Sequence, residues 1–501
     1  MGIWRLSALL LLVAGCVDTL DVGRPITLLA VGGWSPDQRH RLSNAAESWN
    51  VELGTKLELA PSGEQEVWIR SSDFACAYTS GVTTLDDVQV QICTLDASEP
   101  TSLLSVTLHE LGHVLNIVGH ADNDPNAVMS PESGNDRRFT AVDRELFRQA
   151  NPDFSPDGGC AVARPLAFSH SKPAAVSTPN GPHLVWGNEQ GLHIAALDPA
   201  TAALRSGEAG IPTPAYPEWI RVAVEADELW ISWVEHGTTM YLSHVSLPDL
   251  QASAPVKLDV GDHDYQRLLE ISTAAADTDI YLALTTAETR PTSHLYRLDR
   301  TSGKRRTLLL DALDDVWGFW VRLGGELLLA VRDSEGLAVH SVDRASGSLR
   351  DTLRVAQIEG RTSNDTFRAE VVGQALMLVN RKGQDPVAIR RLAPTSSGLA
   401  VVRSSHLAPP GIGFSLVSVA GSDETLAVAL NSIHAEDLGQ EAFAIKLDAQ
   451  TLQPTTTWRR LSAPDLVGSI QPWVVADGAR FMVVWRELYD LATMELKSRC
   501  F

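Results

Sequence analysis

The sequence predicts an α+β domain followed by an all-β domain, most simply a seven-bladed β-propeller. Residues 25–153 mix strand-like and helix-like apolar patterns. Residues 160–501 carry few helix signals and repeat a short apolar strand at intervals of about 45–55 residues, which is typical of propeller blades. A stretch rich in Pro, Asp and Gly spans residues 151–159, and we expect a linker over residues 154–159. Because single cores seldom exceed roughly 250–300 residues, a chain of 501 residues should hold more than one domain.

The charge of the chain excludes one class of partner. The formal net charge is −21, and no long run of Lys or Arg occurs. Proteins that bind nucleic acid need clustered cations that displace counterions from phosphates, so we expect no nucleic-acid partner.

The first residues predict export and a lipid anchor. Residues 1–15 follow Arg5 with an apolar run too short to span a bilayer, which is typical of a signal peptide. The segment ends in Val-Ala-Gly before Cys16 and resembles the lipobox of bacterial lipoproteins, in which that cysteine carries lipid. An ordinary secretory signal with an incidental cysteine is the alternative. The resemblance implies an exported lipoprotein, held at the periplasmic side or cell surface by lipid on Cys16, with residues 16–24 as a tether.

Export also bears on the other four cysteines, because an extracytoplasmic compartment favours disulfides. We expect Cys76 to pair with Cys93 within the first domain, and Cys160 to pair with Cys500 across the second. None of the four belongs to a C-x-x-C pair, so structural zinc bound through them is the weaker reading.

The α+β domain, residues 25–153, begins with a strand over residues 26–31 and a helix from Pro36 to about Leu53, capped by Ser35. Strands at 67–69 and 88–92 follow. The last of these alternates apolar and polar residues, so we expect an edge strand to which an extended peptide could add.

The helix predicted from about residue 101 to 115 carries the chemistry. His109 and His113 are four residues apart and would project from one face, so their imidazoles could share one metal ion. Glu110 is badly placed as a ligand but within reach of a water on the metal, the position of a general base. The third ligand must come from the following turn, where His120 is our choice and Asp122 the competitor.

These residues resemble the metzincin zinc endopeptidases, especially the matrix-metalloproteinase-like members, over about residues 25–153. The family pattern is H-E-x-x-H-x-x-G-x-x-H followed by a methionine turn, for which residues 126–131 with Met129 are the candidate. The chain departs from it at Asn116, where the family has glycine, and His120 falls one residue late. Asparagine enters the left-handed region more readily than other non-glycine residues, so the helix could end there; alternatively it runs on to Gly119.

The resemblance implies one catalytic Zn²⁺ and hydrolysis of peptide bonds in a protein or peptide substrate. Three neutral histidines would leave the ion its full charge to polarise the scissile carbonyl, and Glu110 would take a proton from water and pass it to the leaving amine. Met129 would form an apolar floor under the histidines. Two alternatives stay open: an inactive lipid-anchored protein that binds through the propeller, and a non-proteolytic zinc hydrolase.

The all-β domain spans residues 160–501. Seven apolar strands recur at 184–186, 229–231, 280–282, 327–329, 376–378, 426–428 and 482–484. Four of them are followed by a second strand that ends in a turn at Asp198, Asp299, Asp343 or Asp448. Two stacked β-sandwiches are the alternative. A bond between Cys160 and Cys500 would close the ring, and a role in binding a substrate or partner is assigned by analogy only.

Overall fold

The chain divides into two compact units, Met1–Pro156 and Asp157–Phe501. The computed structural model describes residues 20–501 apart from short gaps. The gaps are residues 74–80, 85–88, 132–136, 157–159, 161, 170, 214, 216, 236–238, 248, 261–267, 277, 288–290, 315–316, 334, 344–345, 347, 357–365, 382–384, 397, 412–416, 423, 434–438, 466 and 489–493. Cys16 and Cys76 lie outside the described residues.

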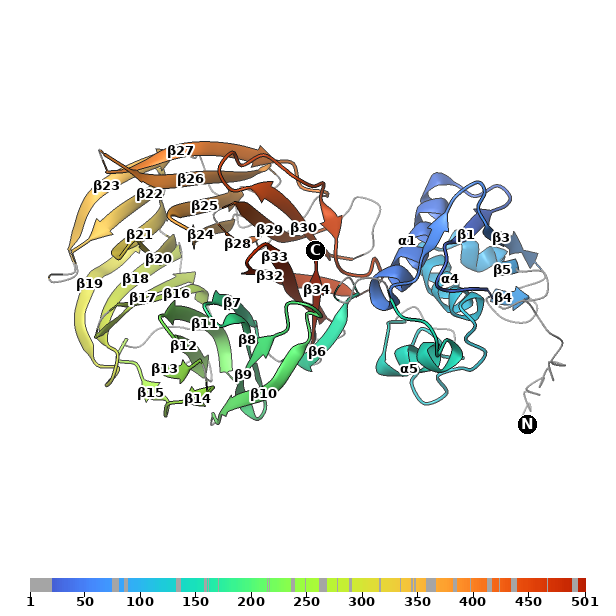
Figure 1. The fold of residues 1–501 in the computed structure, drawn as a ribbon, viewed down its shortest axis with the longest axis horizontal. Coiled ribbons are helices and arrows are strands. Elements are labelled where there is room, and N and C mark those ends of the chain that lie inside the picture. The colour runs from blue at the N-terminus through green and yellow to red at the C-terminus, as the bar shows by residue number, and fades with distance from the viewer. Residues whose placement is uncertain are drawn as a thin grey trace. The chain divides into compact units, whose positions relative to one another are not determined.

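The first unit contains a five-stranded sheet with the order β2-β1-β3-β5-β4 (Figure 1). The strands are β1 (Ile26–Ala30), β2 (Leu57–Leu59), β3 (Gln65–Ser72), β4 (Gly81–Thr84) and β5 (Gln89–Cys93). β1, β2, β3 and β5 run parallel, and β4 pairs antiparallel with β5. The prediction that β5 is the edge strand is therefore wrong. The alternation of apolar and polar residues in β5 shows only that one face of the strand is buried, and a strand paired on both sides can also have one buried face. The edge strand is β4.

The helices among the described residues of this unit are α1 (Pro36–Leu53), α3 (Thr94–Ser98), α4 (Pro100–Val114) and α5 (Ala141–Ala150). Ser35 caps α1 as predicted, in a capping box with Gln38. The fully buried Trp49 of α1 donates its indole N–H to the carbonyl of Leu108 in α4 at 2.9 Å, and its ring meets Phe139 edge-on at 4.8 Å. This contact joins α1 to the helix that carries the histidines.

The second unit is a seven-bladed β-propeller, as the strand spacing predicted, and the two stacked sandwiches are excluded (Figure 1). Each blade is an antiparallel sheet whose first strand faces a central cavity of about 350 Å³. In blade order the strands are β7 (Ala174–Thr178), β8 (Gly181–Asn188), β9 (Gly191–Leu197), β10 (Leu204–Ile211); β11 (Pro217–Glu225), β12 (Glu228–Glu235), β13 (Thr239–Ser246), β14 (Gln251–Ala252), β15 (Val256–Lys257); β16 (Leu268–Ala276), β17 (Asp279–Ala287), β18 (Pro291–Asp299), β19 (Arg305–Asp314); β20 (Trp317–Leu323), β21 (Glu326–Asp333), β22 (Gly336–Val342), β23 (Leu349–Ala356); β24 (Thr366–Val372), β25 (Ala375–Arg381), β26 (Val387–Thr395), β27 (Gly398–Leu407); β28 (Val417–Gly421), β29 (Thr425–Ser432), β30 (Glu441–Asp448), β31 (Arg459–Arg460); β32 (Gly468–Asp477), β33 (Arg480–Leu488), β34 (Met494–Cys500) and β6 (Arg164–Phe168).

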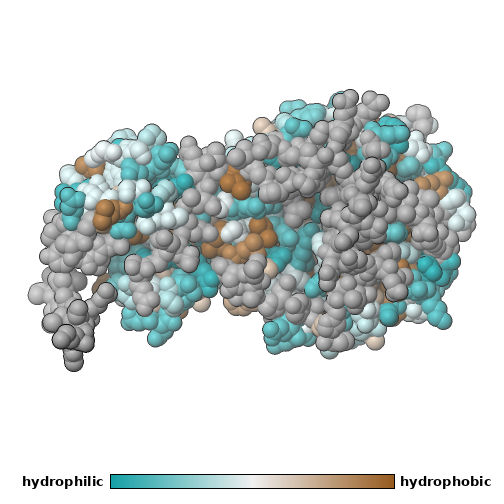
Figure 2. Space-filling view, turned by 180° about the vertical axis from the view of Figure 1, so that it is seen from behind, coloured by the Kyte–Doolittle hydropathy of each residue, from teal (hydrophilic) through white to brown (hydrophobic). Residues whose placement is uncertain are grey.

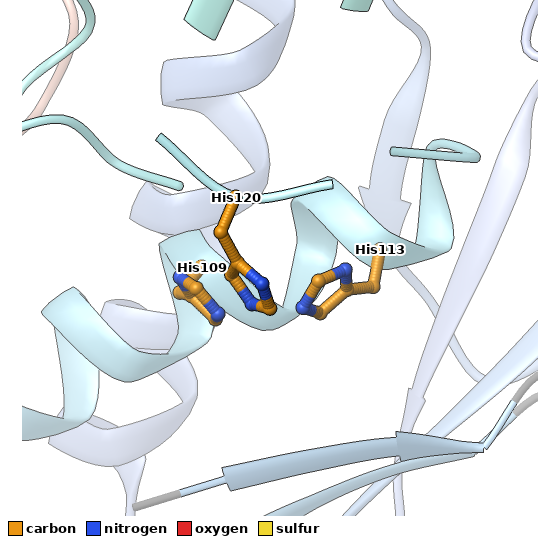
Figure 3. Close-up of side chains that lie close together, drawn as sticks. All are labelled: His109, His113 and His120. Carbon is orange, nitrogen blue, oxygen red and sulfur yellow. The ribbon is translucent and has the colours of Figure 1, made fainter. Parts of the chain in front are cut away.

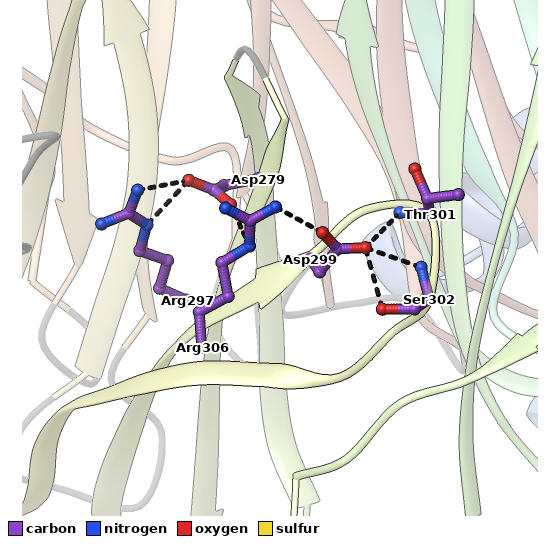
Figure 4. Close-up of polar contacts among 6 residues, drawn as sticks. All are labelled: Asp279, Arg297, Asp299, Thr301, Ser302 and Arg306. Carbon is purple, nitrogen blue, oxygen red and sulfur yellow. Dashed lines mark hydrogen bonds and ion pairs between the residues drawn. The ribbon is translucent and has the colours of Figure 1, made fainter.

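The seven strands named from the sequence are the second strands of the seven blades, β8, β12, β17, β21, β25, β29 and β33. These strands are covered on both faces by neighbouring blades, which is why they read as continuous apolar runs. The aspartates expected in turns follow the third strands. Asp299 is typical: its carboxylate accepts hydrogen bonds from the backbone N–H groups of Thr301 and Ser302 at 3.1 and 2.8 Å (Figure 4).

The ring closes between the two ends of this unit. β6, from the start of the unit, forms the outer strand of the last blade by pairing antiparallel with β34. The expected disulfide joins Cys160 to Cys500 with their Cα atoms 5.2 Å apart, and the backbone N–H of Cys500 donates to the carbonyl of Cys160 at 2.8 Å. Cys93 is also disulfide-bonded, and its predicted partner Cys76 is outside the described residues.

The coloured surface in Figure 2 is mostly hydrophilic, with small separate hydrophobic patches, as the net charge of −21 leads one to expect. Among the described residues, no helix combines the length and the apolar character needed to cross a membrane.

Candidate metal centre

Three histidines converge at the carboxyl-terminal half of α4 (Figure 3). His109 and His113 lie one helical turn apart with ring centroids 4.9 Å from each other, and His120 approaches from the segment after the helix, 5.3 and 5.2 Å from the two rings. One ligand atom of each ring lies within 4.8 Å of the other two. Asp122, the competitor for the third position, is exposed and not part of this group.

The turn that brings His120 back begins at Asn116. α4 ends at Val114, and Asn116 follows it with a left-handed backbone whose φ is 68°. Of the two predicted ends of this helix, the one near Asn116 is therefore confirmed and the one at Gly119 is wrong. The backbone N–H of Ile117 bonds the carbonyl of Gly112 at 3.1 Å, and that of Asn116 bonds the carbonyl of His113 at 3.0 Å. This pair of bonds is a Schellman motif with asparagine in the position that glycine usually takes.

The side chain of Asn116 strengthens the turn in a way that glycine could not. Its Nδ2 donates to the backbone carbonyl of Leu20 at 3.1 Å and to Oδ1 of Asn151 at 3.0 Å. The Nδ2 of Asn151 in turn donates to the carbonyl of Leu115 at 2.9 Å, one of the carbonyls left open at the helix end. Asparagine therefore keeps the left-handed geometry and ties the helix end to two other segments.

Backbone carbonyls orient the two helical imidazoles. The Nδ1 of His109 lies 2.9 Å from the carbonyl oxygen of Val128, and the Nδ1 of His113 lies 2.6 Å from that of Ile117. Since only a protonated nitrogen can donate to a carbonyl, both rings carry the proton on Nδ1 and leave the lone pair of Nε2 for a metal. The Schellman turn thus fixes the tautomer of His113, because it supplies the Ile117 carbonyl.

Met129 packs beneath this helix and is fully buried. A Cβ on Gly112 would lie 2.1 Å from the Met129 sulfur, so only glycine allows this approach. The carboxylate of Asp143, at the start of α5, accepts the backbone N–H groups of Met129 at 2.8 Å and Val128 at 3.2 Å. Asp143, the capping-box partner of Thr140, therefore also holds the turn that contains Met129, and with it the carbonyl that orients His109.

Glu110 lies beside the histidines and is 4% exposed. The hydroxyl of Thr83, on the edge strand β4, donates to its Oε2 at 2.6 Å. Burial raises the pKa of the Glu110 carboxyl to about 7, against the opposite effects of the Thr83 hydrogen bond and the charge of Arg137. A carboxyl with this pKa can accept and return a proton near neutral pH.

The histidines are kept neutral by their surroundings. Burial, the charge of Arg137 and the neighbouring His113 lower the pKa of His109 to about 3. Burial also lowers the pKa values of His113 and His120. Neutral imidazole is the form that binds a metal, so this group is prepared for a cation without first losing protons. Three neutral nitrogen donors around one point fit zinc, which takes His₃ sets with an open fourth position.

Three residues of this centre were not named as functional from the sequence: Thr83, Gly112 and Arg137. Thr83 lies in a short strand with no strong pattern, and the approach of Met129 to Gly112 depends on contacts between distant segments. Asp143 belongs to the capping box of α5, and its contact with Met129 likewise joins segments whose approach no local pattern encodes.

Comparisons with known proteins do not assign the chain to a family. No family model and no curated protein matches the chain. The β-propeller domain of Cps50 (Swd1) from Myceliophteria thermophila is 11% identical, with a TM-score of 0.40, and the match covers 67% of this chain and 98% of that one. A prolyl endopeptidase is 16% identical with a TM-score of 0.34, covering 64% and 46%. A PL25 ulvan lyase is 11% identical with a TM-score of 0.40, covering 66% and 92%.

Proposed function

We propose that the first unit is a metzincin-like zinc endopeptidase and that the propeller binds its substrate or a partner. The convergence of His109, His113 and His120 around one point carries this proposal. A buried acid next to the first histidine and a buried methionine packed against Gly112 of the histidine-bearing helix support it, because they match the roles that the sequence motif implies.

The residues have separate tasks in peptide hydrolysis. His109, His113 and His120 would hold a zinc ion, which supplies Lewis-acid polarisation of the scissile carbonyl. Glu110 takes a proton from the attacking water and delivers it to the leaving amine. The Thr83 hydroxyl holds Oε2 of Glu110 in place and would leave the other carboxylate oxygen to accept the proton from water.

The edge strand β4 suits an extended substrate. Among the described residues it pairs only with β5, and its Thr83 contacts Glu110. A peptide that added to the other side of β4 would pass close to the histidines. Backbone hydrogen bonds to β4 would then hold a protein substrate in register without requiring one particular sequence.

Zinc content and cleavage of casein by the full chain test the proposal. We expect about one zinc per chain, cleavage that a chelator abolishes and zinc restores, and a loss of at least about a hundredfold in Glu110→Gln. A matched control, Glu99→Gln at the start of α4, should cleave normally. Chain without zinc, or full activity in Glu110→Gln, would overturn the mechanism.

The third ligand can be tested separately. His120→Ala should lose zinc affinity by at least about tenfold, whereas Asp122→Ala should retain it, since Asp122 is exposed and outside the cluster. The reverse result would assign the ligand to Asp122.

Two other functions remain as outcomes of these experiments. Zinc without cleavage of any peptide in a library would favour a non-proteolytic zinc hydrolase. Absence of zinc from folded chain would favour an inactive protein that binds through its propeller. We also propose attachment to a membrane through lipid on Cys16, which incorporation of labelled palmitate in a bacterial host, and its loss in Cys16→Ser, would test.

A further inference from the structure

The chain that precedes β1 is docked on the first unit. Residues 20–24 belong to the expected tether, yet Val22 is only 6% exposed. The backbone N–H of Asp21 donates to Oε1 of Gln65 in β3 at 2.8 Å, and Nε2 of Gln65 donates to the carbonyl of Asp21 at 3.0 Å. The same Nε2 donates to the carbonyl of Pro25 at 3.3 Å. One glutamine side chain therefore holds this segment against the sheet.

Asp21 also folds the segment into a turn. Its Oδ1 accepts a hydrogen bond from the backbone N–H of Gly23 at 3.0 Å, and its carbonyl accepts one from the backbone N–H of Arg24 at 3.0 Å. Nζ of Lys56 donates to the carbonyl of Gly23 at 3.3 Å. Residues 21–24 are thus a bonded part of the first unit and do not behave as a loose linker.

Leu20 joins this segment to the candidate metal centre. Its carbonyl accepts a hydrogen bond from Nδ2 of Asn116 at 3.1 Å, and the backbone N–H of Asn116 bonds the carbonyl of His113 at 3.0 Å. Following these bonds and the two side chains, the point where the three histidines converge lies within about 25 Å of Leu20. The place where the docked chain begins is therefore close to the metal centre.

The docking shortens the reach of a lipid on Cys16. Four peptide steps separate Cys16 from Leu20, and an extended chain covers at most about 14 Å in four steps. If the whole expected tether over residues 16–24 were undocked, the nine steps from Cys16 to Pro25 would cover about 32 Å. With the docked segment, the convergence point of the histidines lies no further than about 40 Å from the lipidated residue.

A short reach selects substrates by their position. A tethered site meets only those partners that its linker allows it to reach, and for partners within reach the tether raises the effective concentration. A protein in the same membrane is such a partner when its peptide bond lies near the bilayer. A bond that is held far above the bilayer is out of range.

We propose that the metal centre acts on protein segments at the membrane surface, within about 40 Å of the bilayer that holds the lipid. This inference rests on the proposed lipid attachment and the proposed peptidase activity, and it names the substrate class of that site. The docked residues 20–24 set the range.

Energy transfer from a dye on Val118→Cys to a dye-labelled lipid measures the height of the metal centre. Val118 is 69% exposed and lies two positions before His120 in the sequence. With the lipidated chain in phosphatidylcholine vesicles, we expect a distance to the bilayer surface below about 40 Å. Inserting about thirty Gly and Ser residues between Cys16 and Leu20 should increase it, because such a linker spans about 30 Å on average. Equal distances in the two chains would overturn the inference.

Cleavage of anchored substrates tests the consequence. A casein-derived site is placed either next to the membrane anchor or at the far end of a rod of immunoglobulin domains, in the same vesicles. The natural chain should cut the near site at least about fivefold faster than the far site, and the lengthened chain should lose most of this preference. Both chains should cut casein in solution at the same rate. Equal cleavage of near and far sites by the natural chain would overturn the inference.

Hydrogen exchange tests the docking without a membrane, in the Cys16→Ser chain. The amide of Asp21 should be protected, and Gln65→Leu should reduce that protection at least about tenfold. The matched control is Gln91→Leu, because Gln91 is an equally half-buried strand glutamine that, among the described residues, makes no hydrogen bond to residues 20–24. Equal exchange of this amide in wild type and Gln65→Leu would contradict the docking that limits the reach.

The outcomes separate this inference from the proposals beneath it. A short distance to the bilayer in a chain that leaves casein uncut would contradict the peptidase proposal. A chain that incorporates no labelled palmitate would contradict the lipid attachment, and this inference would fall with it. A chain that carries lipid and cuts casein, but shows no preference for the near site, would overturn this inference alone.

Discussion

At the scale of single residues, Asn116 shapes the turn that brings His120 to the other two histidines of the candidate metal centre. Its left-handed backbone and its two side-chain hydrogen bonds are separate contributions. Both Asn116→Gly and Asn116→Ala lose the hydrogen bonds, but only alanine places a Cβ in the left-handed region, at an extra cost of about 1 kcal/mol. Denaturant unfolding of the first unit should show this difference, and equal stability of the two variants would mean that the turn relaxes.

Gly112 and Met129 form the second test at this scale. Gly112→Ala should destabilise the first unit by about 1–3 kcal/mol, because the new Cβ would overlap the Met129 sulfur. Met129→Ala should leave a cavity and cost about 2–5 kcal/mol on its own. In the double variant the overlap between the new Cβ and the Met129 sulfur is absent. The loss of stability in the double variant should therefore differ from the sum of the two single losses by at least about 0.5 kcal/mol. Simple additivity would show that the two side chains do not constrain each other.

At the scale of elements, α5 supports the candidate metal centre through Asp143. Asp143→Asn replaces an acceptor oxygen by an N–H₂ group that faces the backbone N–H groups of Thr140, Met129 or Val128. We expect the first unit to lose about 1–3 kcal/mol and zinc affinity to fall, since the turn also carries the carbonyl that orients His109. Glu145→Gln, on the exposed side of the same helix, is the control and should change little.

The turn between β18 and β19 gives another test of an element. Gly303→Ala should destabilise the propeller, because the added Cβ meets the Lys257 carbonyl. Gly478→Ala is matched to it, with a similar φ of 59° and no atom within 4 Å of the added Cβ. Both variants share the cost of a left-handed alanine, so a larger loss in Gly303→Ala measures the contact, and equal losses would exclude it.

Elements also show what the sequence could predict. The second strands of the blades were predicted because burial on both faces makes them uniformly apolar, and α1 was predicted because Ser35 and Pro36 mark its start. Strand β4 was missed, since four residues at a sheet edge carry too little pattern. The histidines named from the sequence are those that the structure brings together, because their spacing along the chain is itself the signal. Thr83 reaches Glu110 only through pairing of β4 with β5, which no local pattern encodes.

At the scale of the whole molecule, the propeller depends on one covalent and one hydrogen-bonded closure. A chain with Cys160→Ser and Cys500→Ser should unfold at a lower denaturant concentration than the wild type. Its free energy of unfolding should be about 2–4 kcal/mol lower, because the disulfide restricts a very long loop in the unfolded state. Zinc content should stay unchanged, since the ligands lie in the other unit. Reductant should destabilise the propeller of the wild type and leave the propeller of the variant unaffected, and an equal response of the two propellers would assign the effect elsewhere.

The pairing of β6 with β34 also sets the order in which the protein can mature. The outer strand of the seventh blade is made before the first blade, and its partner is made after the sixth, with Cys160 and Cys500 separated by 340 positions. Each blade hairpin can form locally, but the ring can close only when the last hairpin meets the first strand, and such distant contacts form slowly. During that interval β6 is an unpaired strand and two thiols are free, so the maturing chain requires protection from aggregation and mispairing until closure.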